Sequence, residues 1–262
     1  MSREIILRAR RLGVCYRRGL GPFARPLYWA LKRVSFDLHS GETLGVIGRN
    51  GAGKSTLLRI LAGIIAPDVG ELLVRPGLRR TLLALQAGFM PNLTGRENVV
   101  LSGLLLGMAR RRIDACMDQI TAFSELAEFI DLPIKHYSVG MRARLGFAVA
   151  LHADADVLLI DEVLGVGDAA FRAKSKAAMR DKIRSDKAVV LASHEPGTLR
   201  ELCDRLVWIE SGQVAMTGPT ETVLEAYRAT AGPSGPGGRA REVLAPGPAA
   251  DPPVPVHTHR PY

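Results

Sequence analysis

Cysteine is scarce in this sequence, and long hydrophobic runs are missing. The 262 residues include three cysteines, Cys15, Cys116 and Cys203. Because these thiols are few, scattered and odd in number, they do not suggest a disulfide framework or a cysteine metal site, and we expect reduced packing residues in a cytosolic protein. The apolar runs, such as residues 104–106 and 157–160, are far shorter than the roughly 20 residues of a membrane-spanning helix.

The charge of the chain is unbalanced toward the basic side. Lysine and arginine number 35 against 26 acidic residues, which gives a net charge of +9. A basic surface favours the binding of polyanions such as nucleic acid, anionic lipid headgroups or acidic partner loops. A basic, solvated surface without such a partner explains the same net charge. The length and the 47% hydrophobic content fit one large α/β domain, or one domain with an inserted lobe. Residues 1–7 lack an extended apolar core and a cleavage site, so no secretory signal is predicted.

Residues 48–56 carry the strongest chemical signal. They read Gly-Arg-Asn-Gly-Ala-Gly-Lys-Ser-Thr and fit the phosphate-binding pattern Gly-x-x-x-x-Gly-Lys-Ser/Thr. Glycines let backbone N–H groups approach phosphate oxygens, and the following helix directs its positive end at the same anion. Lys54 adds a cation for the outer phosphates, and Ser55 offers a hydroxyl to Mg²⁺. The candidate nucleotide-binding residues are Gly48, Asn50, Gly51, Ala52, Gly53, Lys54, Ser55 and Thr56.

The context of this loop favours a nucleotide site over an ordinary glycine-rich turn. A buried strand at residues 43–47 leads in, and a helix at residues 55–62 leads out. A second buried strand ends in two adjacent carboxylates, Asp161 and Glu162. Since ligands bind beyond the carboxyl ends of parallel strands, we expect Asp161 to hold Mg²⁺ through its water shell and Glu162 to polarise an attacking water as general base.

Short apolar segments bounded by turn residues predict β-strands over the first 85 residues. The predicted strands are residues 5–9, 13–16, 34–38, 43–47, 71–74 and 81–85. Between the second and third of them, residues 17–25 are rich in glycine and arginine and predict an exposed loop.

A mostly helical lobe is predicted over residues 91–150, inserted into an α/β core. It opens with a capping box formed by Thr94 and Glu97, and Pro133 breaks its helical pattern. The predicted helices before that break are residues 94–106, 112–123 and 125–130.

Strand–helix alternation returns after this lobe. The predicted strands are residues 157–160, 188–192, 205–209 and 213–216, and the predicted helices are 169–185, 195–203 and 219–229. The last two strands form a hairpin around Ser211 and Gly212. From about Gly232 the composition changes to proline, glycine and alanine, so we predict a folded nucleotide-binding domain over residues 1–230 and a disordered tail over residues 231–262.

One further motif makes a family resemblance specific. Residues 137–141, Tyr-Ser-Val-Gly-Met, open a long helix shortly before the acidic strand, and residues 192–194, Ala-Ser-His, end a later strand. Together with the phosphate loop, this order resembles the ATP-binding subunit of an ABC transporter. The usual family signature is Leu-Ser-Gly-Gly-Gln. The Ser-x-Gly-Met form is similar to that of the ATPases that export polysaccharide, O-antigen or teichoic acid.

The resemblance implies a P-loop NTPase core of the RecA-like type, with an N-terminal antiparallel β subdomain and the inserted helical subdomain. It implies that Ser138 and Gly140 contact the γ-phosphate held by a second subunit. The resemblance also places Asp168 in the loop that links the two sites. It implies that His194 is the switch histidine and that Gln86 contacts Mg²⁺. Tyr16 is the first candidate to stack on adenine, with Tyr28 and Trp29 as the competing aromatics.

The expected protein is therefore the ATPase of an ABC exporter for a cell-surface glycan, using ATP and Mg²⁺. The resemblance implies a homodimer bound to a separate integral membrane permease at the cytoplasmic face of the inner membrane, with no nucleic acid partner. Two other functions stay open from the residues. One is a soluble ABC ATPase that acts on nucleic acid or ribosomes, which the basic charge permits, and the other is an exporter of a drug or lipid.

Overall fold

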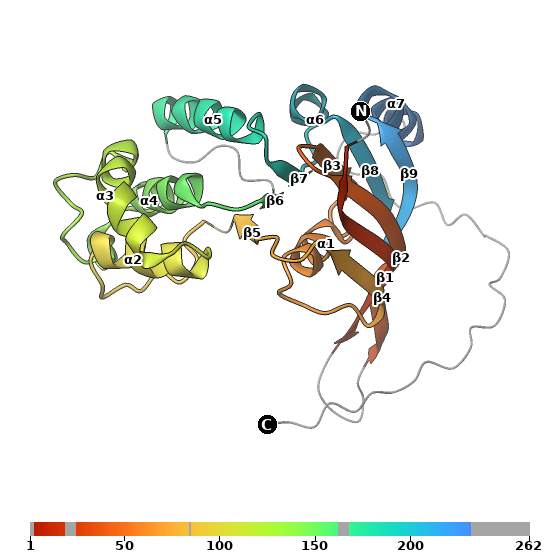
Figure 1. The fold of residues 1–262 in the computed structure, drawn as a ribbon, viewed down its shortest axis with the longest axis horizontal. Coiled ribbons are helices and arrows are strands. Elements are labelled where there is room, and N and C mark those ends of the chain that lie inside the picture. The colour runs from red at the N-terminus through yellow and green to blue at the C-terminus, as the bar shows by residue number, and fades with distance from the viewer. Residues whose placement is uncertain (1–2, 19–24, 84, 162–167, 232–262) are drawn as a thin grey trace, which may run out of the picture.

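The computed structural model describes residues 3–18, 25–83, 85–161 and 168–231 (Figure 1). The predicted general base Glu162 and the predicted tail from residue 232 onward lie outside these residues.

A six-stranded sheet forms the centre of the fold. Its strands are β3 (Thr43–Ile47), β5 (Arg80–Leu83), β6 (Val157–Asp161), β7 (Ala188–Ala192), β8 (Arg205–Glu210) and β9 (Gln213–Pro219). The spatial order is β5-β6-β7-β3-β8-β9, parallel except for the antiparallel β8–β9 pair. Every residue of β3 and β7 is buried, because both faces of this sheet are covered, and continuous apolar runs are typical of such strands.

The two faces of this sheet pack against different parts of the chain. One face meets α1 (Lys54–Leu61) and the N-terminal strands in one apolar cluster. The other face meets four further helices in a second cluster. These helices are α4 (Val139–His152), α5 (Ala169–Ile183), α6 (Pro196–Leu202) and α7 (Thr220–Ala231). In the described part of the chain, no helix combines the length and the apolar character that crossing a membrane requires.

A second sheet has three antiparallel strands in the order β2-β1-β4, formed by β1 (Ile5–Arg18), β2 (Arg25–His39) and β4 (Val69–Val74). The prediction of separate strands at residues 5–9 and 13–16 is wrong, because β1 is continuous. Arg11 has a φ of 48°, and the register shifts between Ala9 and Leu12, as at a β-bulge.

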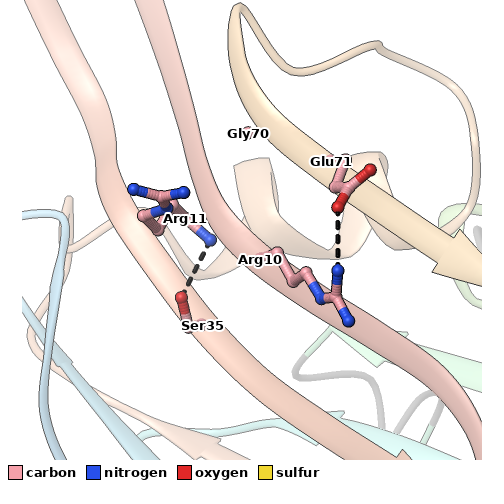
Figure 2. A pocket seen from close by; sticks show the side chains of 5 residues that line it. All are labelled: Arg10, Arg11, Ser35, Gly70 and Glu71. Atoms are coloured by element: carbon pink, nitrogen blue, oxygen red, sulfur yellow. Dashed lines mark hydrogen bonds and ion pairs between the residues drawn. The ribbon is translucent and has the colours of Figure 1, made fainter.

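Figure 2 shows the residues that line a pocket beside this irregularity. The backbone N–H of Arg11 donates to Ser35 Oγ at 2.8 Å, and Arg10 Nη1 lies 3.2 Å from Glu71 Oε1. Gly70 has a φ of 81°, and a Cβ there would lie 2.2 Å from the carbonyl oxygen of Arg11. Glycine is therefore required where β4 passes the bulge of β1.

The helices α2 (Gly95–Leu105), α3 (Arg110–Ser124) and α4 gather on one side of the molecule (Figure 1), with a short 3₁₀ turn, η1 (Ile134–His136), between α3 and α4. The predicted capping box is confirmed, since Thr94 and Glu97 exchange both hydrogen bonds. The predicted helix over residues 125–130 is wrong. Glu125 ends α3 with a φ of 59°, and the following residues form turns that Tyr137 holds by donating its hydroxyl to the carbonyl oxygen of Phe129 at 2.6 Å.

Candidate nucleotide site

The phosphate-binding loop connects β3 to α1 and needs its glycines for two reasons. Gly51 and Gly53 have φ values of 81° and 106°, which residues with a Cβ rarely adopt. A Cβ on Gly48 would lie 2.3 Å from the carbonyl oxygen of Ile209. A Cβ on Gly53 would lie 2.5 Å from that of Ala30. The loop therefore fits closely between β2 and β8, with its backbone exposed toward a ligand.

Lys54 is buried inside this loop and bonds to the loop's own backbone. Its Nζ donates to the carbonyl oxygen of Gly48 at 2.8 Å and to that of Arg49 at 3.3 Å. The N-cap residue of α1, Gly53, makes no side-chain cap, so the N–H groups of the first turn have no capping side chain. Such groups bind phosphate readily at a helix N-terminus.

A cavity of about 300 Å³ opens in front of the loop. Asp161, the last residue of β6, lines this cavity together with Lys54 and Ser55. The complete lining is Tyr28, Ala30, Asn50, Gly51, Gly53, Lys54, Ser55, Thr56 and Asp161. The structure thus brings the two separate sequence signals, the loop and the acidic strand end, to one place.

Asp161 and Ser55 suit Mg²⁺ by the chemistry of their oxygens. Magnesium prefers oxygen ligands and is usually held by one or two carboxylates, substrate phosphates and water, rather than by a complete protein cage. Among the described residues, no group of three or more His, Cys, Asp and Glu residues is placed to hold a metal ion. A site with one carboxylate and one hydroxyl is consistent with an ion that arrives with a phosphate ligand.

His194 lies at the same edge of the sheet. In the register of the parallel strands, Ala192 of β7 pairs with both Val46 of β3 and Asp161 of β6. Ser193 follows, with its N–H donating to the carbonyl oxygen of Val46 at 3.2 Å. His194 comes directly after Ser193 and is exposed, so it lies at the sheet edge where β3, β6 and β7 end, although it lines neither cavity.

The aromatic residue at the cavity is Tyr28 rather than Tyr16. The two tyrosines are direct partners across β1 and β2, and both are about two-fifths exposed. Only Tyr28 lines the phosphate cavity, and it also lines a second, adjoining cavity of about 590 Å³. Trp29 contributes to this second cavity, and Tyr16 to neither.

Gln86 packs against α4 and lines neither cavity. It has a left-handed φ of 64° and is exposed. A Cβ on Gly146 of α4 would come within 2.7 Å of the Gln86 backbone nitrogen, so the absence of a side chain there permits the close approach.

Ser138 and Gly140 also lie outside the phosphate cavity of their own chain. Ser138 is the N-cap residue of α4, and its Oγ accepts a hydrogen bond from the N–H of Met141 at 3.1 Å. The next residue, Val139, is 73% exposed. Asp168 caps α5 in the same way, with Oδ1 accepting from the N–H of Phe171 at 3.0 Å. Both helix starts therefore face solvent rather than the phosphate loop that this chain carries.

Residues 31–165 match the family described as ABC transporter. The chain belongs to this family. Among curated proteins it is 44% identical over 201 residues to an O-antigen export system ATP-binding protein, RfbB, of Klebsiella pneumoniae, covering 77% of this chain and 81% of that one.

Two other relatives of this ABC family member are longer. RfbB of Myxococcus xanthus is 48% identical over 77% of this chain and 46% of that protein. The teichoic acids export ATP-binding protein TagH of Enterococcus faecalis is 45% identical over 78% of this chain and 45% of that protein. The chain therefore spans about half the length of these two curated relatives.

The dimeric structure of a bacterial ABC transporter cassette has the same fold. Its TM-score is 0.65 at 21% identity, covering 82% of this chain and 99% of that one. A dimeric cassette in a post-hydrolysis state bound to ADP and phosphate gives a TM-score of 0.63 at 22% identity, covering 82% and 99% of the two chains. The expected α/β fold of a P-loop ATPase is thus confirmed.

Some residues around the site of this ABC family member were not found from the sequence. The β8–β9 hairpin contributes to the lining of the second cavity, and the hairpin residues that line it are Trp208, Ile209, Glu210 and Ser211. These residues lie about 160 positions from the loop, and nothing in their local sequence links them to it. Their approach follows from β8 pairing with β3, which a pattern within one segment does not reveal.

Proposed function

We propose that this chain is the ATP-hydrolysing subunit of an exporter that moves a cell-surface polysaccharide through a separate membrane subunit. One observation supports this proposal above the others: Lys54, Ser55 and Asp161 line one cavity, whereas Ser138 at the start of α4 lies outside it. The chain would then carry the phosphate-binding half of one site and the signature half of another, as expected for a subunit that works in pairs.

In the proposed reaction, Lys54 exchanges its bonds to the loop carbonyls for bonds to the outer phosphates of ATP. Ser55 and Asp161 would hold Mg²⁺, and Gln86 is a further candidate ligand. When bound, Mg²⁺ would neutralise negative charge on the phosphate oxygens while water attacks the γ-phosphorus and the bond from the γ-phosphorus to ADP breaks. Glu162 accepts the proton of the attacking water, and His194 orients the γ-phosphate.

The base of the nucleotide would lie against Tyr28. The ring of this residue is part of both cavities, so one bound nucleotide can place its phosphates in the first and extend its base and ribose toward the second. An aromatic face of this kind binds a purine by stacking. This assignment replaces Tyr16, the first candidate from the sequence.

The proposed assembly is a head-to-tail homodimer in which Ser138, Gly140 and Asp168 of one subunit complete the phosphate site of the other. The dimer would bind an integral membrane permease at the cytoplasmic face of the inner membrane, and no nucleic acid. We further propose residues 1–230 as the ATPase domain, residues 91–150 as its helical subdomain, and residues 231–262 as a tail.

The proposed cargo rests on the relatives. The names of the two RfbB proteins describe O-antigen export, and that of TagH describes export of teichoic acids. Both cargoes are polymers of the cell surface, and the Met141 variant of the signature helix agrees with this group.

The test has two parts, and Glu162→Gln serves in both. The purified variant should bind MgATP as the natural chain does but lose at least 95% of steady-state hydrolysis. Undiminished hydrolysis would remove Glu162 as the base. In cells, the same variant should abolish the surface glycan and leave its precursor inside. An unchanged surface glycan together with lost hydrolysis would reject the cargo but keep the ATPase.

A further inference from the structure

Four alternating charges join α3, α4 and the start of α5. Arg144 of α4 donates from Nη2 to Asp168 Oδ2 at 2.9 Å and from Nη1 to Glu125 Oε2 at 3.1 Å. Lys174 of α5 donates from Nζ to the other carboxylate oxygen of Glu125 at 2.8 Å. The bonds therefore run from the N-cap of α5, through α4, to the C-cap of α3 and back to α5.

A group of three phenylalanines underlies these charges. Phe123, Phe147 and Phe171 come from α3, α4 and α5, with ring centroids 5.7 to 6.3 Å apart. The Arg144 guanidinium lies 5.5 Å from the Phe171 ring centroid, and Lys174 Nζ lies 4.7 Å from that of Phe123. Because a guanidinium is planar and donates in two directions at once, a lysine at position 144 cannot reproduce both bonds and the ring contact.

Asp168 uses its two oxygens for different partners. Oδ1 accepts from the N–H of Phe171, and Oδ2 accepts from Arg144. The Phe171 N–H is the main cause that lowers the pKa of Asp168, and the charge of Arg144 lowers it further. The carboxylate therefore stays ionised at neutral pH and bonds both to the start of α5 and to α4.

The two helices are also joined at their other ends. Lys182, near the end of α5, donates from Nζ to the carbonyl oxygens of Leu151 and Ala153 at 2.5 and 2.7 Å. These carbonyls belong to the last turn of α4 and the residue that ends it, where a lysine can satisfy otherwise unpaired acceptors. Contacts at both ends oppose rotation of α4 and α5 relative to each other.

We propose that Arg144 is a positioning residue that fixes Asp168 and the first turn of α5 to α4. On the proposed function, on which this consequence rests, Ser138 and Asp168 both meet the nucleotide of the partner subunit. The cluster of Glu125, Arg144, Asp168 and Lys174 keeps these two contact points in one rigid unit. This unit extends past residue 150 to include the beginning of α5.

Hydrogen exchange of the full chain tests the positioning directly. Arg144→Ala should speed exchange of the Phe171 amide at least tenfold, because the carboxylate that accepts from this N–H loses its anchor. Amides in the last turn of α5 should keep their rates. Arg144→Lys should restore the slow exchange only in part. The matched control is Arg180→Ala, which removes an exposed arginine of α5 from its 2.7 Å pair with Glu201 and should leave the first turn of α5 unchanged.

Turnover as a function of protein concentration tests the consequence. At saturating MgATP, Arg144→Ala should raise the protein concentration for half-maximal turnover about tenfold. The affinity of the separated Arg144→Ala monomer for MgATP should stay as in the natural chain. The Arg180→Ala control should behave as the natural chain in both measurements. Unchanged exchange at Phe171 would overturn the proposal. Faster exchange without a change in concentration dependence would overturn the link to the paired site. Absent hydrolysis in the natural chain would instead reject the proposed function, and the exchange result would still decide whether Arg144 positions Asp168.

Discussion

Tyr28 donates its hydroxyl to the carbonyl oxygen of Gly51 at 3.3 Å, whereas Tyr16, its direct partner across the two strands, lines neither cavity. The bond joins β2 to the phosphate-binding loop. It holds the ring of Tyr28 at the boundary between the phosphate cavity and the cavity beside the β8–β9 hairpin.

Replacing Tyr28 should therefore weaken nucleotide binding more than replacing Tyr16. Stacking of a base on an aromatic ring contributes about 1–3 kcal/mol, so Tyr28→Ala should raise the Kd for MgATP by roughly tenfold or more. Tyr28→Phe keeps the ring and should stay within about threefold of the natural chain, as should Tyr16→Ala. Calorimetric titration with MgATP measures all three, and a larger loss for Tyr16→Ala would restore Tyr16 as the stacking residue.

Asn98 is a fully buried polar residue of α2 that holds the preceding loop. Its Oδ1 accepts from the N–H of Met90, and its Nδ2 donates to the carbonyl oxygens of Met90, Leu93 and Thr94, all within 2.7 to 3.1 Å. Since a buried group left without its partner costs about 1–3 kcal/mol, Asn98→Ala should lower the free energy of unfolding by about 2–4 kcal/mol.

The matched control for Asn98 is on the same helix. The Oγ of Ser102 is buried and has no hydrogen-bond partner, so Ser102→Ala should be neutral or slightly stabilising. Urea denaturation followed by circular dichroism measures both variants. Equal losses for the two would show that Asn98 acts through its volume and not through its hydrogen bonds.

Lys182 should make stability depend on pH in the alkaline range. Burial is the main cause that lowers its pKa from 10.5 to about 8, and the charge of Lys187 adds to the effect. Below pH 8 both the folded and the unfolded chain carry the proton, and the folded state bears the full cost of the buried charge. Between pH 8 and 10.5 the folded state gives up the proton while the unfolded state keeps it, so stability rises with pH.

Lys182→Met removes this dependence and provides the comparison. As the pH is raised from 7.5 to 10, the free energy of unfolding of the natural chain should rise relative to that of the variant, by at most about 1.4 kcal/mol per pH unit. Denaturation at four or five pH values measures the difference. A constant difference across the range would mean that Lys182 titrates at its ordinary pKa.

Local sequence patterns predicted the parts of the fold that depend on interactions between residues close together in the sequence. The capping box of Thr94 and Glu97 involves residues three apart, and the phosphate-binding loop is one continuous segment, so both can be recognised in the sequence. The strands β3 and β7 were predicted at their observed bounds because each is a short apolar run buried on both faces. Asp161 could be placed near the loop because parallel strands end at a common edge.

Other features depend on contacts that no local pattern contains. Residues 125–130 carry apolar side chains at helical spacing, but Glu125 turns left-handed, where Arg144 and Lys174 bind its carboxylate. The bulge at Arg11 depends on Gly70 of β4, about 60 residues away. The choice of Tyr28 over Tyr16 depends on how the loop approaches β2, which sequence spacing does not give.

The central claim is that each working site is built from two copies of the chain, and mixing two inactive variants tests it. Lys54→Ala removes the phosphate-binding half, and Ser138→Arg blocks the half offered to the partner. Each variant alone should hydrolyse MgATP at below about 1% of the natural rate. In an equal mixture, half of the dimers pair one variant with the other and contain one intact composite site, so about a quarter of the natural number of sites and a measurable part of the activity should return. A mixture that stays as inactive as its components, or a Ser138→Arg variant that is fully active alone, would contradict the account.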